Sequence, residues 1–203
     1  MNDIHRNEAE LEGLVQTPPA YSHENHGKPF YRCLLSVPRL SGQTDLLPLL
    51  LPEELQSAAV PGERLRLQGQ LRSFNNRSGQ GSRLVLSTHA LALLPPTGEN
   101  GNRILLQGVL CKDPTYRRTP LGRSICDLML AVSRRYGRAD YLPLIAWGQL
   151  ASDLSQRRTG DALALEGRIQ SRTYTKNLET GPQERVAYEV SVMRPAELSE
   201  FVE

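Results

Sequence analysis

Short stretches in which polar and apolar residues alternate recur along the chain. Residues 64–68 read Arg-Leu-Arg-Leu-Gln, and Leu163, Leu165 and Gly167 occupy every second position of a similar stretch. Residues 186–192 again place Val, Tyr, Val and Val at alternate positions. A period of two gives a strand one buried and one solvated face. The pattern therefore predicts a β-rich chain.

The pattern repeats along the chain. At an offset of 95 residues Gly13 falls on Gly108, and after three inserted residues the stretch 62–69 matches 160–167. Further matched pairs are Pro19 with Pro114, Tyr21 with Tyr116, Arg39 with Arg134 and Asp45 with Asp140. Because one register is kept through so many Gly and Pro positions, we interpret the chain as an internal duplication.

A segment rich in Pro, Gly and Asn separates the two copies. These residues end regular structure and favour solvated turns. The sequence therefore predicts an N-terminal domain over residues 1–94, a linker over 95–101 and a C-terminal domain over 102–203.

Each copy contains three predicted strands, one short helix and two further strands. Gly13 and Gly108 lie in the first strand of each copy, where glycine permits the sharp bend of a small barrel. Leu150, Ala151 and Leu154 have helical spacing in the second copy. This layout is that of an OB fold. The expected fold class is all-β, with two tandem five-stranded OB-fold barrels, each with one short helix.

The basic residues bear on the kind of ligand, and the search for targeting signals bears on the cellular location. The net charge is only +2, and among 24 basic residues the lysines are confined to positions 28, 112 and 176. Arginine pairs with phosphate and stacks on bases, so its dominance points to a nucleic-acid surface in the second half of the chain, and by charge alone a solvated face stays open as the alternative. No apolar stretch has membrane-spanning length and no secretory pattern opens the chain. We expect a cytoplasmic protein without a membrane partner.

The chain offers little material for catalysis or metal binding. Cys33, Cys111 and Cys126 form no CxxC pair, and we expect them to be buried small hydrophobic residues. Neither a phosphate-binding loop nor a nucleophile or metalloprotease motif occurs. We expect no enzyme, no cofactor, no metal ion and no catalytic residue.

The second copy resembles the DNA-binding domain of bacterial single-stranded DNA-binding proteins. The resemblance covers roughly residues 102–195 and follows an ordered set of segments. These are 102–110 for the first strand, Asp113-Pro114 for the turn, 130–133 and 145–148 for the next strands, and 160–174 for the fourth.

The resemblance implies which residues bind. Members of that family stack bases on four aromatic side chains, and the matching positions hold Tyr136, Tyr141, Trp147 and Tyr174. The alternative interpretation makes Trp147 a core residue and the three tyrosines ordinary surface residues. Basic residues expected to contact phosphates are Arg134, Arg135, Arg138, Arg168, Arg172 and Lys176, extended by Arg117, Arg118 and Arg123 on the first hairpin.

The first copy departs from the pattern. Its matching positions hold Ser41, Leu46, Pro52 and Asn76, so it lacks the stacking aromatics. A loop over residues 75–83 carries two arginines. We interpret this barrel as serving assembly or an extended track rather than a second full-strength site.

The sequence thus predicts a non-enzymatic protein that binds and protects single-stranded DNA in replication, recombination or repair. Because the family works with four OB domains per particle, the resemblance implies a homodimer. It also implies a location at the bacterial nucleoid and contacts with replication or repair proteins. RNA is an alternative ligand. The alternative function is an OB-fold protein-interaction module of a primosome or recombination complex.

Overall fold

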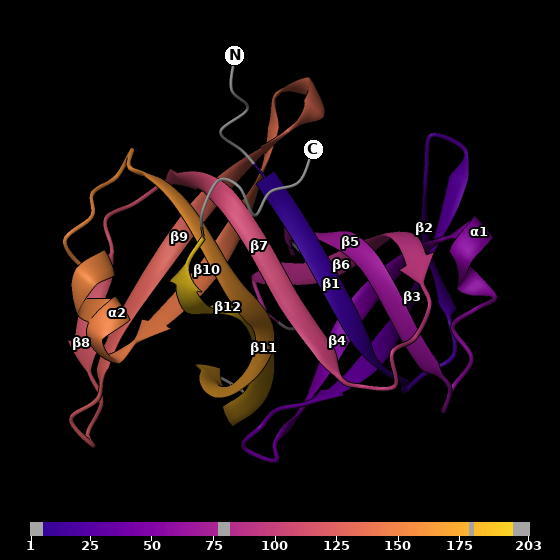
Figure 1. Cartoon of the computed structure of the whole chain (residues 1–203), viewed down its shortest axis with the longest axis horizontal. Helices are drawn as coiled ribbons and strands as arrows, with labels where there is room; N and C mark the ends of the chain where they lie inside the picture. The colour runs from indigo at the N-terminus through magenta and orange to yellow at the C-terminus, as the bar shows by residue number, and fades with distance from the viewer. Residues whose placement is uncertain (1–5, 77–81, 179–180, 197–203) are drawn as a thin grey trace. The chain divides into compact units, whose positions relative to one another are not determined.

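The computed structural model describes residues 6–76, 82–178 and 181–196. Within them lie twelve strands, two short α-helices and one 3-10 turn (Figure 1). No helix in these ranges is long and apolar enough to cross a membrane.

The first copy folds into a closed barrel of five strands with one additional strand. Strand β3 pairs antiparallel with β1, β2 and β4, β4 pairs parallel with β6, and β5 lies between β6 and β1. The elements are β1 (Arg6–Val15), β2 (Ala20–Asn25), β3 (Lys28–Pro38), β4 (Thr44–Pro52), α1 (Glu53–Gln56), β5 (Arg64–Asn75) and β6 (Leu84–Leu94).

The second copy repeats this topology. Strand β9 pairs antiparallel with β7, β8 and β10, β10 pairs parallel with β12, and β11 lies between β12 and β7. The elements are β7 (Gly101–Leu110), β8 (Thr115–Arg118), β9 (Ser124–Arg134), η1 (Arg135–Gly137), β10 (Arg138–Trp147), α2 (Gly148–Leu154), β11 (Ala162–Leu178) and β12 (Gly181–Pro195). The predicted tandem OB fold, with one short helix in each copy, is confirmed.

Glycine closes each barrel at the same place. A Cβ atom on Gly13 would lie 2.3 Å from the Ser36 carbonyl oxygen, and one on Gly108 would lie 2.5 Å from that of Ala131. Both separations are shorter than any side chain allows, so β1 approaches β3, and β7 approaches β9, only because the residue is glycine.

Alternation along the strands builds the two cores. Leu47 and Leu49 of β4 and Leu142 and Leu144 of β10 are at most 2% exposed. Helix α2 adds the buried Ala151 to the second core. Burial of one such leucine contributes about 1.5–3 kcal/mol.

Contacts between residues group the chain into two compact units. The first-barrel unit contains Glu8–Arg72 and Leu86–Arg103. The second-barrel unit contains the described residues of Ile104–Glu203, together with those of Met1–Asn7 and those of Ser73–Val85, where β5 ends and β6 begins. The division into these two units follows spatial contacts and does not test the domain boundaries expected from the duplication, which stay a prediction.

The predicted linker is hydrogen-bonded within the first-barrel unit. The buried Glu12 carboxylate accepts the backbone N–H of Thr97 at 2.9 Å, the Thr97 hydroxyl at 2.7 Å and the Gly98 N–H at 2.9 Å. Arg64 donates to the Glu99 carbonyl at 3.0 Å. Desolvation opposes ionisation of Glu12, but these hydrogen bonds outweigh it and lower the pKa of Glu12.

The cysteines differ from the expectation at one position. Cys33 and Cys126 are buried, and burial raises the pKa of the Cys33 thiol to about 11. Cys111 is exposed, so the expected burial is wrong there: it follows the end of β7, beyond the buried part of the strand. Among the described residues, no three His, Cys, Asp or Glu side chains gather at a possible metal site.

Candidate nucleic-acid interface

Strand register places two of the four expected aromatic residues on one surface. The buried Asp140, Leu142 and Leu144 point inward from β10, so alternate residues point outward. Tyr141 lies opposite Ala131 of β9 and Trp147 opposite Ile125. Tyr141 is 50% exposed and Trp147 is 41% exposed, so the interpretation of Trp147 as a core residue is wrong.

The same surface continues across β12 and β11. Ile145, which shares the outward side of β10, pairs with Ser191 of β12, and Ser191 pairs with Arg168 of β11. Because every second residue of β11 keeps that side, Arg172 and Tyr174 follow Arg168. Lys176 is the next residue in this row. We call this outward side of β8, β9, β10, β12 and β11 the outer face.

Two carboxylates also lie on the outer face. Asp127 accepts from the Arg117 Nε at 2.7 Å, and this hydrogen bond raises the pKa of Arg117. Glu189 lies 3.5 Å from the Arg172 Nε. The Arg172 guanidinium also sits over the Tyr174 ring, 5.6 Å from its centroid. Both arginines are thus oriented by partners before any ligand arrives.

Neither of these two acids was expected at the interface from the sequence. The signal for Asp127 was available, because the period of two in β9 puts it on the side away from Leu128 and Leu130. Glu189 required the register of β12 against β11, where it lies opposite Gln170 and accepts its side-chain N–H at 3.1 Å.

The three arginines expected on the first hairpin separate. Arg117 lies on the outer face, whereas Arg118 pairs with Ser124 and shares the opposite side with Tyr116. The Tyr116 hydroxyl is 2.7 Å from the Ser124 hydroxyl, and hydrogen bonds from Ser124, then Arg118 and the α2 residue Ser152, lower the pKa of Tyr116. The exposed Arg123 lies in the turn between β8 and β9.

The turn between β9 and β10 carries the fourth aromatic residue. Tyr136 is 96% exposed and has a backbone φ of 63°, in the left-handed region. Its neighbours Arg135 and Arg138 are exposed. The ring therefore stands in solvent at the end of the outer face, flanked by two cations.

Arg134 has a structural partner. Its Nη1 lies 3.5 Å from a carboxylate oxygen of Asp140, which is fully buried. The first copy contains the equivalent pair, because Arg39 Nε donates to the buried Asp45 at 2.7 Å. The first barrel lacks the stacking aromatics but keeps this ion pair. The role of the pair is therefore to neutralise a buried carboxylate.

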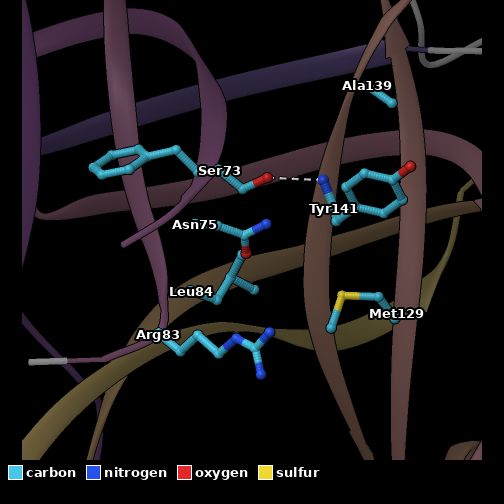
Figure 2. Close-up of a pocket in the computed structure, with 8 residues that line it drawn as sticks. Ser73, Asn75, Arg83, Leu84, Met129, Ala139 and Tyr141 are labelled. Atoms are coloured by element: carbon cyan, nitrogen blue, oxygen red, sulfur yellow. Dashed lines mark hydrogen bonds between the residues drawn. The ribbon is translucent and has the colours of Figure 1, made fainter. Parts of the chain in front are cut away.

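A cavity of about 480 Å³ opens beside Tyr141 within the second-barrel unit. Figure 2 shows Tyr141 and Met129 on one side and Asn75, Leu84 and Arg83 across from them. The Ser73 hydroxyl accepts the Tyr141 backbone N–H at 2.7 Å (dashed line in Figure 2). Part of the loop expected over residues 75–83, with Arg77, lies outside the described residues.

Comparisons with known proteins match this region. The model of the single-strand binding protein family matches residues 101–196. A single-stranded DNA-binding protein of Clostridium tetani is 38% identical over 80 residues, which are 36% of this chain and 55% of that protein. One of Thermus aquaticus is 38% identical over 81 residues, 37% of this chain and 31% of that protein. The chain thus matches about half or less of these curated relatives.

Solved structures extend the likeness in fold to both barrels. The single-stranded DNA binding protein from Thermus aquaticus superposes with a TM-score of 0.73 at 23% identity, covering 95% of this chain and 94% of that chain. A deletion mutant of the same protein gives a TM-score of 0.72 at 23% identity, covering 95% and 96%.

Proposed function

The chain belongs, through residues 101–196, to the single-strand binding protein family, and we propose that it binds and protects single-stranded DNA. The binding has little sequence preference, because every base offers a π face for stacking. The role is in replication, recombination or repair, by a binding protein without a catalytic centre.

The observation that carries the proposal is the composition of the outer face. Tyr141, Trp147 and Tyr174 share it with Arg168 and Arg172. Stacking contributes about 1–3 kcal/mol per base, and the guanidinium groups neutralise phosphates between the stacked bases. A strand that crosses β10 towards β11 meets both kinds of group in turn.

The ends of this path are basic as well. Tyr136 would stack one more base, with Arg135 and Arg138 beside it, at the η1 end. Lys176 extends the path along the β11–β12 hairpin. We assign phosphate contacts to Arg117 and Arg123 at the β8–β9 hairpin, and Arg134 and Arg118 contribute mainly through their side-chain partners.

Fluorescence of Trp147, the only tryptophan, tests the proposal. Titration with a dT oligonucleotide should quench the fluorescence strongly, and duplex DNA of equal length, as the control, should not. Across a salt series, the slope of log K against log[salt] should be about −0.7 for each phosphate neutralised. Tight binding without quenching would move the strand off the outer face, and no binding at low salt would refute the function.

The oligomeric state, the cellular location and the protein partners belong to the same proposal. A homodimer would bring four OB domains to one strand, at the bacterial nucleoid in the cytoplasm, together with replication or repair proteins. RNA is the competing ligand, and the same titration with oligo(U) measures the preference.

One observation favours the alternative, a protein-interaction module of a primosome or recombination complex. The outward side of β3 and β4 in the first barrel carries apolar residues next to the exposed Arg32: Pro48 lies opposite Leu34, and Leu46 is 40% exposed. An exposed apolar surface without aromatic platforms is more typical of protein contacts than of DNA contacts. Failure of the titration would promote this function for the whole chain.

A further inference from the structure

The second-barrel unit contains a cavity that includes residues from the first copy's β5–β6 hairpin. Strand β10 pairs with β12 at Leu144 and Ile145, and nearer its start Ser73 occupies its edge. The Ser73 backbone N–H donates to Asp140 at 2.9 Å, and its hydroxyl accepts from the Tyr141 N–H at 2.7 Å. These two bonds hold the end of β5 beside the outer face.

The cavity combines apolar walls with polar groups. Tyr141 and Met129 form one wall, and Leu84 forms part of the other (Figure 2). The Asn75 amide and the Arg83 guanidinium face this space, and neither has a side-chain hydrogen bond or ion pair with any described residue. Its volume of about 480 Å³ lies in the range of small-molecule sites.

This set of groups matches the chemistry of one nucleotide. The Tyr141 ring offers a stacking platform, and thioether sulfur makes favourable contacts with aromatic rings. A side-chain amide both donates and accepts, as the edge of a base does. A guanidinium pairs with phosphate.

We propose that the cavity holds one base of the bound strand that is no longer stacked on its neighbouring bases. Tyr141 lies against the face of this base, Asn75 contacts its edge and Arg83 pairs with an adjacent phosphate. The inference rests on the proposed function, since the base comes from the strand on the outer face. It adds a base-edge contact to an interface that otherwise stacks bases without reading them, and it assigns a DNA contact to residues of the first copy.

Alanine substitutions at the cavity test the inference. Asn75→Ala should weaken binding of a dT oligonucleotide about fivefold or more, the lower end of one base contact. Asn177→Ala is the matched control, because Asn177 is exposed and lies on the other side of the β11–β12 ribbon from Tyr174. This control should change affinity less than twofold.

A second pair of variants separates phosphate contact from general charge. Arg83→Ala should weaken binding more than Arg158→Ala, which removes the same charge from the exposed turn before β11. Photo-cross-linking with 4-thiothymidine should label Tyr141 or Met129. Thermal melting checks that the variants stay folded, as expected for exposed side chains.

The outcomes are distinct. If Asn75→Ala and Arg83→Ala bind as the parent does, with Trp147 still quenched, the cavity assignment is overturned and the proposed function stands. If the parent itself neither binds nor quenches, the proposed function fails and the cavity assignment fails with it.

Discussion

Tyr136 combines an exposed ring with a backbone that suits glycine. A φ of 63° at a residue with a Cβ costs about 1–2 kcal/mol. At 96% exposure the ring recovers none of this through packing. Strained residues of this kind occur preferentially at functional sites, which agrees with a role for the ring in binding.

Substitution of Tyr136 separates stability from binding. Tyr136→Gly should leave the free energy of unfolding unchanged or raise it by up to about 1 kcal/mol, because glycine relieves the left-handed strain. It should weaken dT binding about fivefold or more through the lost stacking contact. Denaturant unfolding and the Trp147 titration measure the two effects.

Tyr136→Ala is the control, since it removes the ring and keeps a Cβ at the strained position. The alanine variant should bind dT as weakly as the glycine variant does, and its free energy of unfolding should be lower than that of the glycine variant. Parent-like affinity in both variants would exclude Tyr136 from the interface.

At the scale of elements, the linker is attached to β1 by one carboxylate. Glu12 accepts from Thr97 and Gly98, with Arg64 3.7 Å away. The pKa of Glu12 is lowered from its ordinary value of 4.5, because these hydrogen bonds outweigh desolvation. A lowered pKa in the folded state means that ionisation favours folding.

The attachment of the linker to Glu12 should therefore weaken at acidic pH. Its contribution to stability is fully present above pH 4.5 and is lost as the pH falls through the lower folded-state pKa of Glu12. Limited proteolysis within residues 95–100 should accelerate over that window. Glu12→Gln should be cleaved faster than the parent at neutral pH and show less pH dependence, and equal rates in both proteins would contradict the attachment.

At the scale of the molecule, the duplicated barrels have kept their frame and diverged on their surfaces. Both retain the closing glycine, Gly13 or Gly108, and the Arg–Asp pair at the start of β4 or β10. The outward side of β9 and β10 carries Tyr141 and Trp147, whereas the matching positions of the first copy hold Leu46 and Pro52. Fold and ligand contacts thus depend on separate sets of residues.

The proposed homodimer predicts a specific mass. Light scattering at micromolar concentration should give twice the 22.6 kDa of one chain. The dimer should persist at high salt if apolar contacts form it, because salt screens charges and leaves apolar burial in place. A single-chain mass across the concentration range would remove the homodimer from the proposal and leave two OB domains per particle.

The sequence by itself determined the fold and the matched aromatic positions. Alternation defines which face of a strand is buried, and a repeat at constant offset carries that pattern from one barrel to the next. The same period places Arg117 and Arg118 on opposite sides of β8, although both were expected to contact phosphates. It also places Asp127 on the outer face beside Arg117.

Only the tertiary structure decided which distant residues meet. Glu189 reaches Arg172, and Asn75 and Arg83 face Tyr141, because barrel closure and strand register join segments far apart in the chain. A local pattern fixes the side of a strand to which a residue points, but not which strand lies beside it. The linker's attachment to Glu12 has the same origin, since a carboxylate on β1 meets backbone N–H groups more than 80 residues away.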